Sequence, residues 1–372
     1  MRKRIDFSAG VFYNKREITY NVHHSAEKGC LHMAVTIKDV AALAGVSPST
    51  VSRTCKDNPS ISRETKERVR RAMAQLGYEA NFPASEPAVE QNRRTVGIIL
   101  PPSTRETYEN PFYLEAIRGI SQFCNEHQYL SAVITGQDDE EVLSVIRSMV
   151  REERVDGFVL LYSRRDDAIA EYLYNEGLLY VLIGKAYQYA NQTIYINNDN
   201  LMAGQEATEY LIALGHRRIG YLGSTSSLVF SADRMAGYQM ALRQHELPAD
   251  PACCIEIPCT PPEDTAPIRA MLEREDRPTA ILVSDDILGL VLVQLCSQLG
   301  LSIPGDLSIL SFNDSLFARL SVPQLSSINV NSFQLGIEAA SQLINHIENP
   351  NLLAAKIIVP YSLIERDSCR RL

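Results

Sequence analysis

The sequence predicts an α+β protein of several domains, with a small N-terminal helix-turn-helix head of three helices and a larger α/β body of two Rossmann-like lobes. The first observation is charge: the 372 residues carry a net −9, but residues 33–78 hold eight basic against four acidic side chains, a net +4. Residues 1–32 carry +3, which leaves −16 for residues 79–372. The second observation is a change in the spacing of apolar residues at Thr95. Before it they recur at helical intervals, and after it short continuous apolar runs alternate with amphipathic helices. A chain of this length holds about two or three domains.

Start and stop signals place three helices in the head. Thr36 is a favourable N-cap for a first helix, and Gly45 ends it, since glycine adopts left-handed backbone easily. Ser47 opens a second helix whose first residue is a proline, at a position where the missing N–H is not needed. A third helix is expected within residues 62–77, between a serine cap and a closing glycine. Two short helices joined by a tight turn with glycine are typical of a helix-turn-helix.

The second helix of such a motif enters the major groove of DNA and presents its N-terminal side chains to base edges. Small residues there allow a close approach, and an arginine can donate two hydrogen bonds to guanine O6 and N7. Bases are expected to be read by Pro48, Ser49, Thr50 and Arg53, and phosphates to be bound by Thr36, Ser47, Ser52 and Lys56. The basic charge alone is equally compatible with a three-helix protein-interaction module.

The residues of this region decide between the two interpretations. The string VTIKDVAALAGVSPSTVSR at 35–53 is followed by ISRETKERV at 61–69 and LGY at 76–78. These strings resemble the DNA-binding head of the lac repressor family. The resemblance implies a homodimer that places two heads on a pseudo-palindromic operator in double-stranded DNA. It also favours Met33 as the natural start, with residues 1–32 as a disordered or wrongly assigned leader.

The segment after the head departs from this family. Its members form a hinge helix on DNA, which carries an Ala-Arg pair and a leucine that enters the minor groove. Here residues 80–87 read ANFPASEP, with Ser85 where an arginine is usual and Pro87 near the expected leucine. Because a proline inside a short helix costs about 3 kcal/mol, the hinge at 79–94 is predicted to act as a plain linker.

The body, residues 95–372, alternates strands and helices, which predicts parallel sheets with helices on both faces. About 280 residues are many for one sheet, so two lobes with a cleft between them are expected. Ligands of such sheets bind beyond the carboxyl ends of the strands. Strands are predicted at 96–100, 130–134, 157–161, 179–183, 219–222, 280–283 and 308–311, and helices at 114–126, 142–152 and 203–214.

Polar and aromatic side chains follow several of these strands. They are Asn110, Phe112 and Tyr113 after the first strand, Arg234 after the strand at 219–222, and Asp285 with Asp286 after the strand at 280–283. Aromatic rings, a guanidinium and a carboxylate suit a sugar, because sugars offer apolar C–H faces and hydroxyls that both donate and accept. Taken singly, Arg234 or Asp286 is more typical of a helix cap or a surface ion pair.

Several strings of the body resemble sequences of proteins with the periplasmic-binding-protein fold, which the same repressor family uses to bind sugars. They are NPFY at 110–113, DN at 199–200 with AG at 203–204, LGHRRIGY at 214–221, RMAGY at 234–238, and PQLSSI at 323–328 followed by LG at 335–336. The resemblance implies that Arg234 anchors a sugar hydroxyl. It favours Asp286, which stands three residues before Gly289, over Asp285 as the ligand aspartate, and it implies a packing role for His216.

Within the family, VSDDILG at 283–289 and SFNDS at 311–315 are most similar to the maltose-operon repressors of Gram-positive bacteria. The function that this implies is transcriptional repression controlled by a small sugar, maltose or a maltodextrin. The sugar is expected to bind between the lobes and to favour a closed arrangement. In that arrangement the distance between the two heads no longer matches the two half-sites of the operator. The alternative is a global carbon catabolite regulator controlled by a phosphorylated carrier protein.

Other functional classes find little support. A sugar kinase with a helix-turn-helix head needs an Asp-x-Gly phosphate loop, and neither this nor the common nucleotide, serine-hydrolase and zinc-protease motifs occur, so no enzyme and no cofactor are expected. The eight cysteines form no C-x-x-C pair, which argues against a metal site and fits a reducing cytosol. Without an apolar run of about 18 residues or a signal peptide, neither a membrane partner nor secretion is expected.

Overall fold

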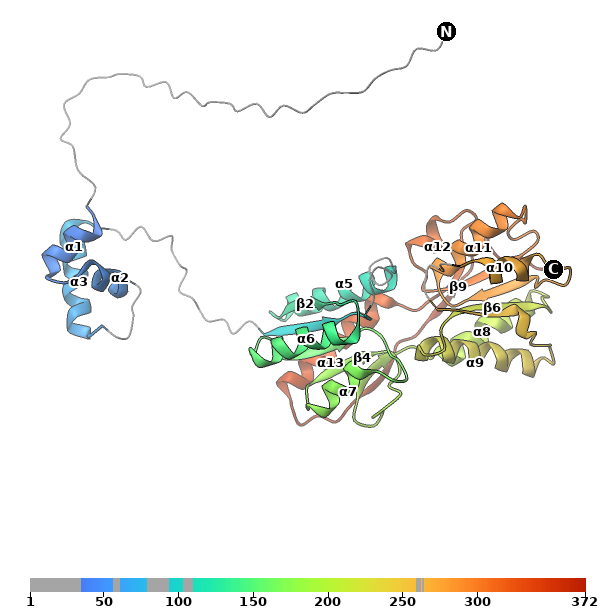
Figure 1. The fold of residues 1–372 in the computed structure, drawn as a ribbon, viewed down its shortest axis with the longest axis horizontal. Coiled ribbons are helices and arrows are strands. Elements are labelled where there is room, and N and C mark those ends of the chain that lie inside the picture. Colours follow the sequence, from blue (N-terminus) through green and yellow to red (C-terminus); the bar gives the residue numbers. More distant parts are fainter. Residues whose placement is uncertain (1–34, 56–60, 79–93, 103–109, 259–261, 263) are drawn as a thin grey trace, which may run out of the picture. The chain divides into compact units, whose positions relative to one another are not determined.

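The structure is a computed structural model, and it describes residues 35–55, 61–78, 94–102, 110–258, 262 and 264–372 (Figure 1). The chain divides into two compact units, Met1–Val89 and Glu90–Leu372. Their boundary falls within the linker that the sequence predicts at 79–94. The leader predicted for residues 1–32 and the linker up to residue 93 lie outside the described residues.

The head contains three helices in the predicted order. They are α1 (Ile37–Ala44), α2 (Pro48–Cys55) and α3 (Arg63–Leu76). Val40, Val51 and Val69, one from each helix, are fully buried and form the centre of a small core. A core of this size leaves most of the helical surface free for a partner.

The helices of the head begin and end at the predicted caps. Thr36 N donates to the Asp39 carboxylate at 2.8 Å at the start of α1. Ser62 Oγ accepts from Thr65 N at 3.3 Å at the start of α3. Both helices end on a glycine with a φ of 64°, in the left-handed region that glycine enters without strain.

The first lobe of the body is a six-stranded parallel sheet in the order β11-β5-β4-β3-β1-β2. Its strands are β1 (Thr95–Ile99), β2 (Leu130–Ile134), β3 (Gly157–Leu160), β4 (Tyr180–Ile183), β5 (Ile194–Asn197) and β11 (Lys356–Ile358). Helices α5 (Pro111–Glu126) and α13 (Ser332–Glu348) pack in one core layer, and α6 (Asp139–Arg151) and α7 (Ala168–Asn175) in the other. Figure 1 shows this layered arrangement.

The second lobe repeats the plan with the order β12-β10-β9-β8-β6-β7, in which only β12 is antiparallel to its neighbour. Its strands are β6 (Ile219–Ser224), β7 (Cys254–Ile257), β8 (Ala280–Val283), β9 (Ser308–Phe312), β10 (Ser326–Asn329) and β12 (Ser362–Ile364). Helices α8 (Asn200–Ala213) and α9 (Val229–Gln244) pack in one core layer. The other layer holds α10 (Ala266–Leu272), α11 (Asp286–Gln298) and α12 (Leu316–Leu320), and a 3-10 turn (Pro251–Cys253) precedes β7.

Within the described residues, the chain passes between the lobes at three connectors. The first connector, 198–199, leads from β5 to α8, the second, 330–331, from β10 to α13, and the third, 359–361, from β11 to β12. Each lobe is therefore assembled from two separated stretches of chain. The connectors make the two lobes one unit with a defined cleft.

The fold class predicted from the sequence is confirmed, and the seven predicted strands lie within two residues of β1, β2, β3, β4, β6, β8 and β9. The predicted helices begin three residues too late. The reason is that α5, α6 and α8 start on polar caps, Asn110, Asp138 and Asp199, whose side chains accept from backbone N–H groups before the first apolar position.

Helices α5 and α13 pack with their backbones in contact through two glycines. A Cβ atom on Gly336 would overlap the carbonyl oxygen of Ala116, and one on Gly119 would overlap that of Phe333. Neither obstacle is a flexible side chain, so an added methyl group forces the helices apart.

We predict that Gly336→Ala lowers the free energy of unfolding by about 1–3 kcal/mol, because overpacking at a backbone contact outweighs the gain in helix propensity. Urea denaturation measures the change. Gln334→Ala, exposed on the same helix, is the control and should stay within about 0.5 kcal/mol of the unaltered protein. Equal stability of the two variants would contradict the close contact.

Candidate functional site

The predicted contact residues whose side chains the structure describes in the head lie at the starts of α1 and α2. Thr36, Ser47 and Pro48 are exposed and Thr50 is half-buried. Ser47 Oγ accepts from Thr50 N at 3.2 Å, which fixes the first turn of this helix. The structure describes the backbone of Ser49, Ser52 and Arg53 but not their side chains, and Lys56 lies outside the described residues. Their predicted DNA contacts therefore stay predictions.

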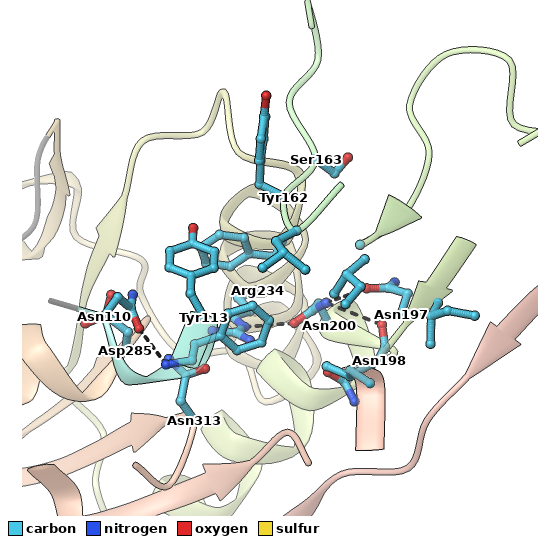
Figure 2. Close-up of a pocket in the computed structure, with 17 residues that line it drawn as sticks. Asn110, Tyr113, Tyr162, Ser163, Asn197, Asn198, Asn200, Arg234, Asp285 and Asn313 are labelled. Atoms are coloured by element: carbon cyan, nitrogen blue, oxygen red, sulfur yellow. Dashed lines mark hydrogen bonds between the residues drawn. The ribbon is translucent and has the colours of Figure 1, made fainter. Parts of the chain in front are cut away.

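In the body, a cavity of about 620 Å³, partly open to solvent, lies between the lobes beyond the carboxyl ends of the strands. Figure 2 shows its polar side chains converging from several elements. The first lobe supplies Asn110, Phe112, Tyr113, Tyr162, Ser163 and Asn197, the first connector Asn198, and the second lobe Asn200, Phe230, Arg234, Asp285 and Asn313.

Arg234, from α9, is the one basic side chain among the described residues that line this cavity, and 4% of its surface is exposed. Its Nε donates to Asn200 Oδ1 at 2.9 Å and its Nη1 to the carbonyl oxygen of Ser284 at 2.6 Å. The Phe312 ring lies 4.0 Å from Cζ. Burial lowers the pKa of Arg234 to about 10, so the group stays charged at neutral pH. A guanidinium has five N–H donors, and these two bonds leave donors for a ligand.

Glycines on α8 and α9 set the position of Arg234. A Cβ atom on Gly204 would overlap the backbone of Arg234 itself, and one on Gly237 would overlap the carbonyl oxygen of Leu201. The two helices are therefore in backbone contact one turn from the guanidinium. This contact explains why AG at 203–204 and the glycine of RMAGY accompany the arginine in the sequence.

Aromatic side chains cover the first-lobe side of the cavity. Asn110 Oδ1 accepts from Phe112 N at 3.0 Å and so starts α5 at the cavity edge. Phe112 and Tyr113 meet edge to face, with ring centroids 5.4 Å apart. The three residues that the sequence predicts here all line the cavity. Their rings offer an apolar surface of the kind that the C–H face of a sugar can contact.

The two adjacent aspartates lie differently with respect to the cavity, and which of them binds the ligand stays a prediction. Asp285 lines the cavity and caps α11, accepting from Leu288 N at 2.9 Å. Asp286 is not among the lining residues, because its carboxylate accepts from Ser311 Oγ, Ser327 Oγ and Ser315 N on the side of β9 and β10. Burial raises the pKa of Asp285 to about 6.

The sequence interpretation missed a group of asparagines. Asn197, Asn198 and Asn200 line the cavity where β5 leads into the first connector, and Asn313 lies after β9. Asn200 holds Arg234, as described above. For Asn200 and Asn313 the signal was present in the strings DN at 199–200 and SFNDS at 311–315, which support the family resemblance but were assigned no ligand contact.

The lobes also touch at the mouth of the cavity. Val229 N donates to the Ser163 carbonyl oxygen and Arg165 N to that of Ser227, both at 3.1 Å. Lys185 Nζ lies 3.4 Å from the Asp233 carboxylate. These contacts hold the lobes in the arrangement that the structure shows.

The remaining predictions concern His216, metals and membranes. His216 is buried away from the cavity and its Nδ1 lies 2.9 Å from Thr279 Oγ1. Within the described ranges, no group of His, Cys, Asp and Glu side chains is arranged to hold a metal ion. In the same part of the chain, no helix is long and apolar enough to cross a membrane.

Comparison with known proteins is consistent with this geometry. The family model for bacterial regulatory proteins of the lacI family matches residues 36–81, and that for a periplasmic binding protein-like domain matches residues 208–369. The transcriptional regulator MalR of Streptococcus pneumoniae is 33% identical over 338 residues, 90% of this chain and 100% of that protein. MalR of Staphylococcus xylosus is 33% identical over 90% of this chain and 98% of that protein.

A solved structure of the transcriptional regulator CelR in complex with cellobiose superimposes with a TM-score of 0.68 at 27% identity, covering 90% of this chain and 99% of that one. These relatives are transcriptional regulators, in agreement with the expectation that the chain is not an enzyme. They also confirm the resemblance to the maltose-operon repressors. The chain therefore belongs to the lacI family of bacterial regulatory proteins and is a transcriptional repressor of that family.

Proposed function

We propose that this repressor is a cytoplasmic homodimer that binds a pseudo-palindromic operator and is controlled by a sugar, with maltose or a maltodextrin favoured, in the cavity between its lobes. The observation that carries the proposal is the buried Arg234 guanidinium, which lies in a cavity with aromatic rings, a carboxylate and amides. The sugar class is supported by the names of the MalR relatives and by cellobiose in the CelR structure.

The cavity matches the chemistry of a sugar ring. Arg234 donates to hydroxyl oxygens, Asp285 accepts from hydroxyl hydrogens, and the amides can do both. Phe112 and Tyr113 contact the apolar face of the ring. Because a ligand in this position touches both lobes, it binds one lobe arrangement better than another and shifts the equilibrium between them.

The head reads the operator through the start of α2. Exposed Ser47 and Pro48 face outward at a helix N-terminus, where backbone N–H groups attract phosphate. Arg53, one and a half turns further along α2, is proposed to read a guanine, and Lys56 to bind phosphate. A change in lobe arrangement alters the distance between the two heads of a dimer and so their fit to the half-sites.

Exposed apolar side chains of the body mark the surfaces that a second copy would cover. In the first lobe, Leu114 on α5 and Leu130 and Val133 of β2, the edge strand of the sheet, are exposed. In the second lobe, Leu320 and Val322 at the end of α12 are 70% and 87% exposed. Exposed large apolar side chains and an open sheet edge are typical of interfaces.

We predict that Arg234→Ala weakens sugar binding by about 1–3 kcal/mol or more, roughly 5- to 150-fold, because the polar partners of the guanidinium lose their donor while buried. Calorimetric titration with maltose and maltotriose measures the affinity, and an operator assay should show unchanged DNA binding with no sugar response. Arg243→Ala, exposed on the same helix, is the control. Unchanged sugar affinity in Arg234→Ala would contradict this site, and a response only to a phosphorylated carrier protein would favour the catabolite regulator.

We predict that sugar affinity falls as the pH is lowered through about 6, the value to which burial raises the pKa of Asp285. Below that pH the carboxyl is protonated and loses acceptor strength toward sugar hydroxyls. The same raised pKa means that the folded state binds the extra proton, so ionisation of Asp285 lowers stability as the pH rises from about 4 to 6. Asp285→Asn should remove the pH dependence of sugar binding, and a flat profile in the unaltered protein would exclude Asp285 from the site.

We predict different effects for two basic residues of the head. Arg53→Ala should cost about 1–3 kcal/mol of operator affinity and relax the preference for one base pair, since it removes a contact to base edges. Lys56→Ala should weaken binding to all sequences alike and reduce the salt dependence. Fluorescence anisotropy with operator and random duplexes at several salt concentrations distinguishes them. An equal loss of Arg53→Ala on both duplexes would assign it to the phosphates.

A further inference from the structure

One side chain, Asn198, contacts all three connectors between the lobes. It belongs to the first connector, and its Nδ2 donates to the carbonyl oxygen of Val330 at 3.1 Å in the second and of Val359 at 2.8 Å in the third. The side chain is buried, with 4% of the residue surface exposed. Its two acceptors are 132 and 161 residues away along the chain.

The chemistry of these two bonds requires an amide. Both acceptors are carbonyl oxygens, so both N–H donors of one NH2 group are used, and this fixes the orientation of the amide. An aspartate at this position has the same shape, but its carboxylate oxygen would face the carbonyl oxygens of Val330 and Val359, and none of these atoms can donate a hydrogen bond. In a buried position, water is not available to replace the lost bonds.

A short chain of hydrogen bonds joins Asn198 to the proposed sugar anchor. The carbonyl oxygen of Asn198 accepts from Asn200 N at 2.9 Å and from Asn200 Nδ2 at 3.3 Å. Asn200 Oδ1 accepts from Arg234 Nε at 2.9 Å. Figure 2 shows Asn200 between Arg234 on one side and Asn197 and Asn198 on the other.

Asn197 strengthens the same link. Its Oδ1 accepts from Asn200 Nδ2 at 3.0 Å, and its carbonyl oxygen accepts from Val359 N at 2.8 Å in the third connector. A displacement of Arg234 by a ligand is therefore separated from the connectors by one side chain, that of Asn200.

The two side-chain bonds described next do not combine burial, contact with all three connectors and a link to Arg234. Asn331 Nδ2 donates to the Pro360 carbonyl oxygen at 2.7 Å, but this exposed bond joins only the second and third connectors. Lys185, which pairs with Asp233 at the mouth, has a side chain that is 52% exposed. Exposed pairs of this kind are weak.

We propose that Asn198 is a positioning residue that fixes the three connectors relative to one another and, through Asn200, transmits the occupation of the site at Arg234 to the angle between the lobes. The part that concerns transmission rests on the proposed sugar control. The part that concerns the connectors holds for the protein without ligand. Asn198 contacts the ligand cavity but acts through its neighbours.

The test uses the full-length protein with Asn198→Asp and, because a buried charge can impair folding, also Asn198→Ala. Asn125→Asp, an exposed position on α5, is the control for the chemical change. Hydrogen exchange without ligand measures the amide of Val359, and the amide of Ile98 in the core of the first lobe reports global stability. We expect exchange at Val359 to accelerate at least tenfold in both Asn198 variants, with Ile98 unchanged and the control like the unaltered protein.

The second measurement is the ratio of operator affinities without and with sugar, using maltose or maltotriose as the probe. A typical ratio is about 5- to 150-fold, and we expect it to fall to within about twofold of unity in the Asn198 variants, measured at a sugar concentration that saturates each variant. Variants that keep both the ratio and the protection at Val359 would overturn the proposal. If no sugar changes the operator affinity of the unaltered protein, both the proposed function and the proposed transmission are contradicted. In that case hydrogen exchange at Val359 still decides whether Asn198 fixes the connectors.

Discussion

A buried guanidinium between two lobes is the constraint on which the rest of the body depends. Removing such a charge from water is costly unless hydrogen bonds and nearby charges replace its hydration. Arg234 obtains these from Asn200 on α8, from the carbonyl oxygen of Ser284 just after β8, and from the Phe312 ring on β9. The glycine contacts between α8 and α9 bring its backbone close enough for all three at once. The hydrogen bonds of Arg234 in the cleft therefore depend on the close packing of α8 and α9 behind it.

Much of the fold could be predicted because the relevant signals are local. The caps Thr36 and Ser62 and the closing glycines lie within one turn of the helices that they limit. The continuous apolar runs identify strands such as β1, β3, β4 and β8, which are buried on two faces. Strand β5 was not predicted, because its short apolar sequence IYIN ends in the polar residue Asn197, which lines the cavity. The short strands β11 and β12 were missed for a related reason, since exposed and half-buried positions interrupt their apolar pattern.

The site was predictable in part, and its limits have a geometrical cause. Arg234 and the aromatic residues at 112–113 follow the ends of strands. Because ligands of parallel sheets bind beyond the carboxyl ends of the strands, their position in the cavity could be predicted. The choice between Asp285 and Asp286 depends on which of the two begins α11: Asp285 has the extended backbone of a cap, and the next side chain projects about 100° away around the helix. The partners of Asn198 lie more than 130 residues away, so no local pattern indicates them.

The interleaving of the lobes bears on how the protein is made. The head is a continuous unit that is complete by residue 78, whereas the first lobe lacks α13 and β11 until residue 358 has been synthesised. At about 5–20 residues per second, roughly 280 further residues take about 15–60 s. During synthesis, the segment that recognises the operator is therefore able to fold well before the connectors close the cavity. A nascent chain has a DNA-reading head before it has any means of sensing a ligand.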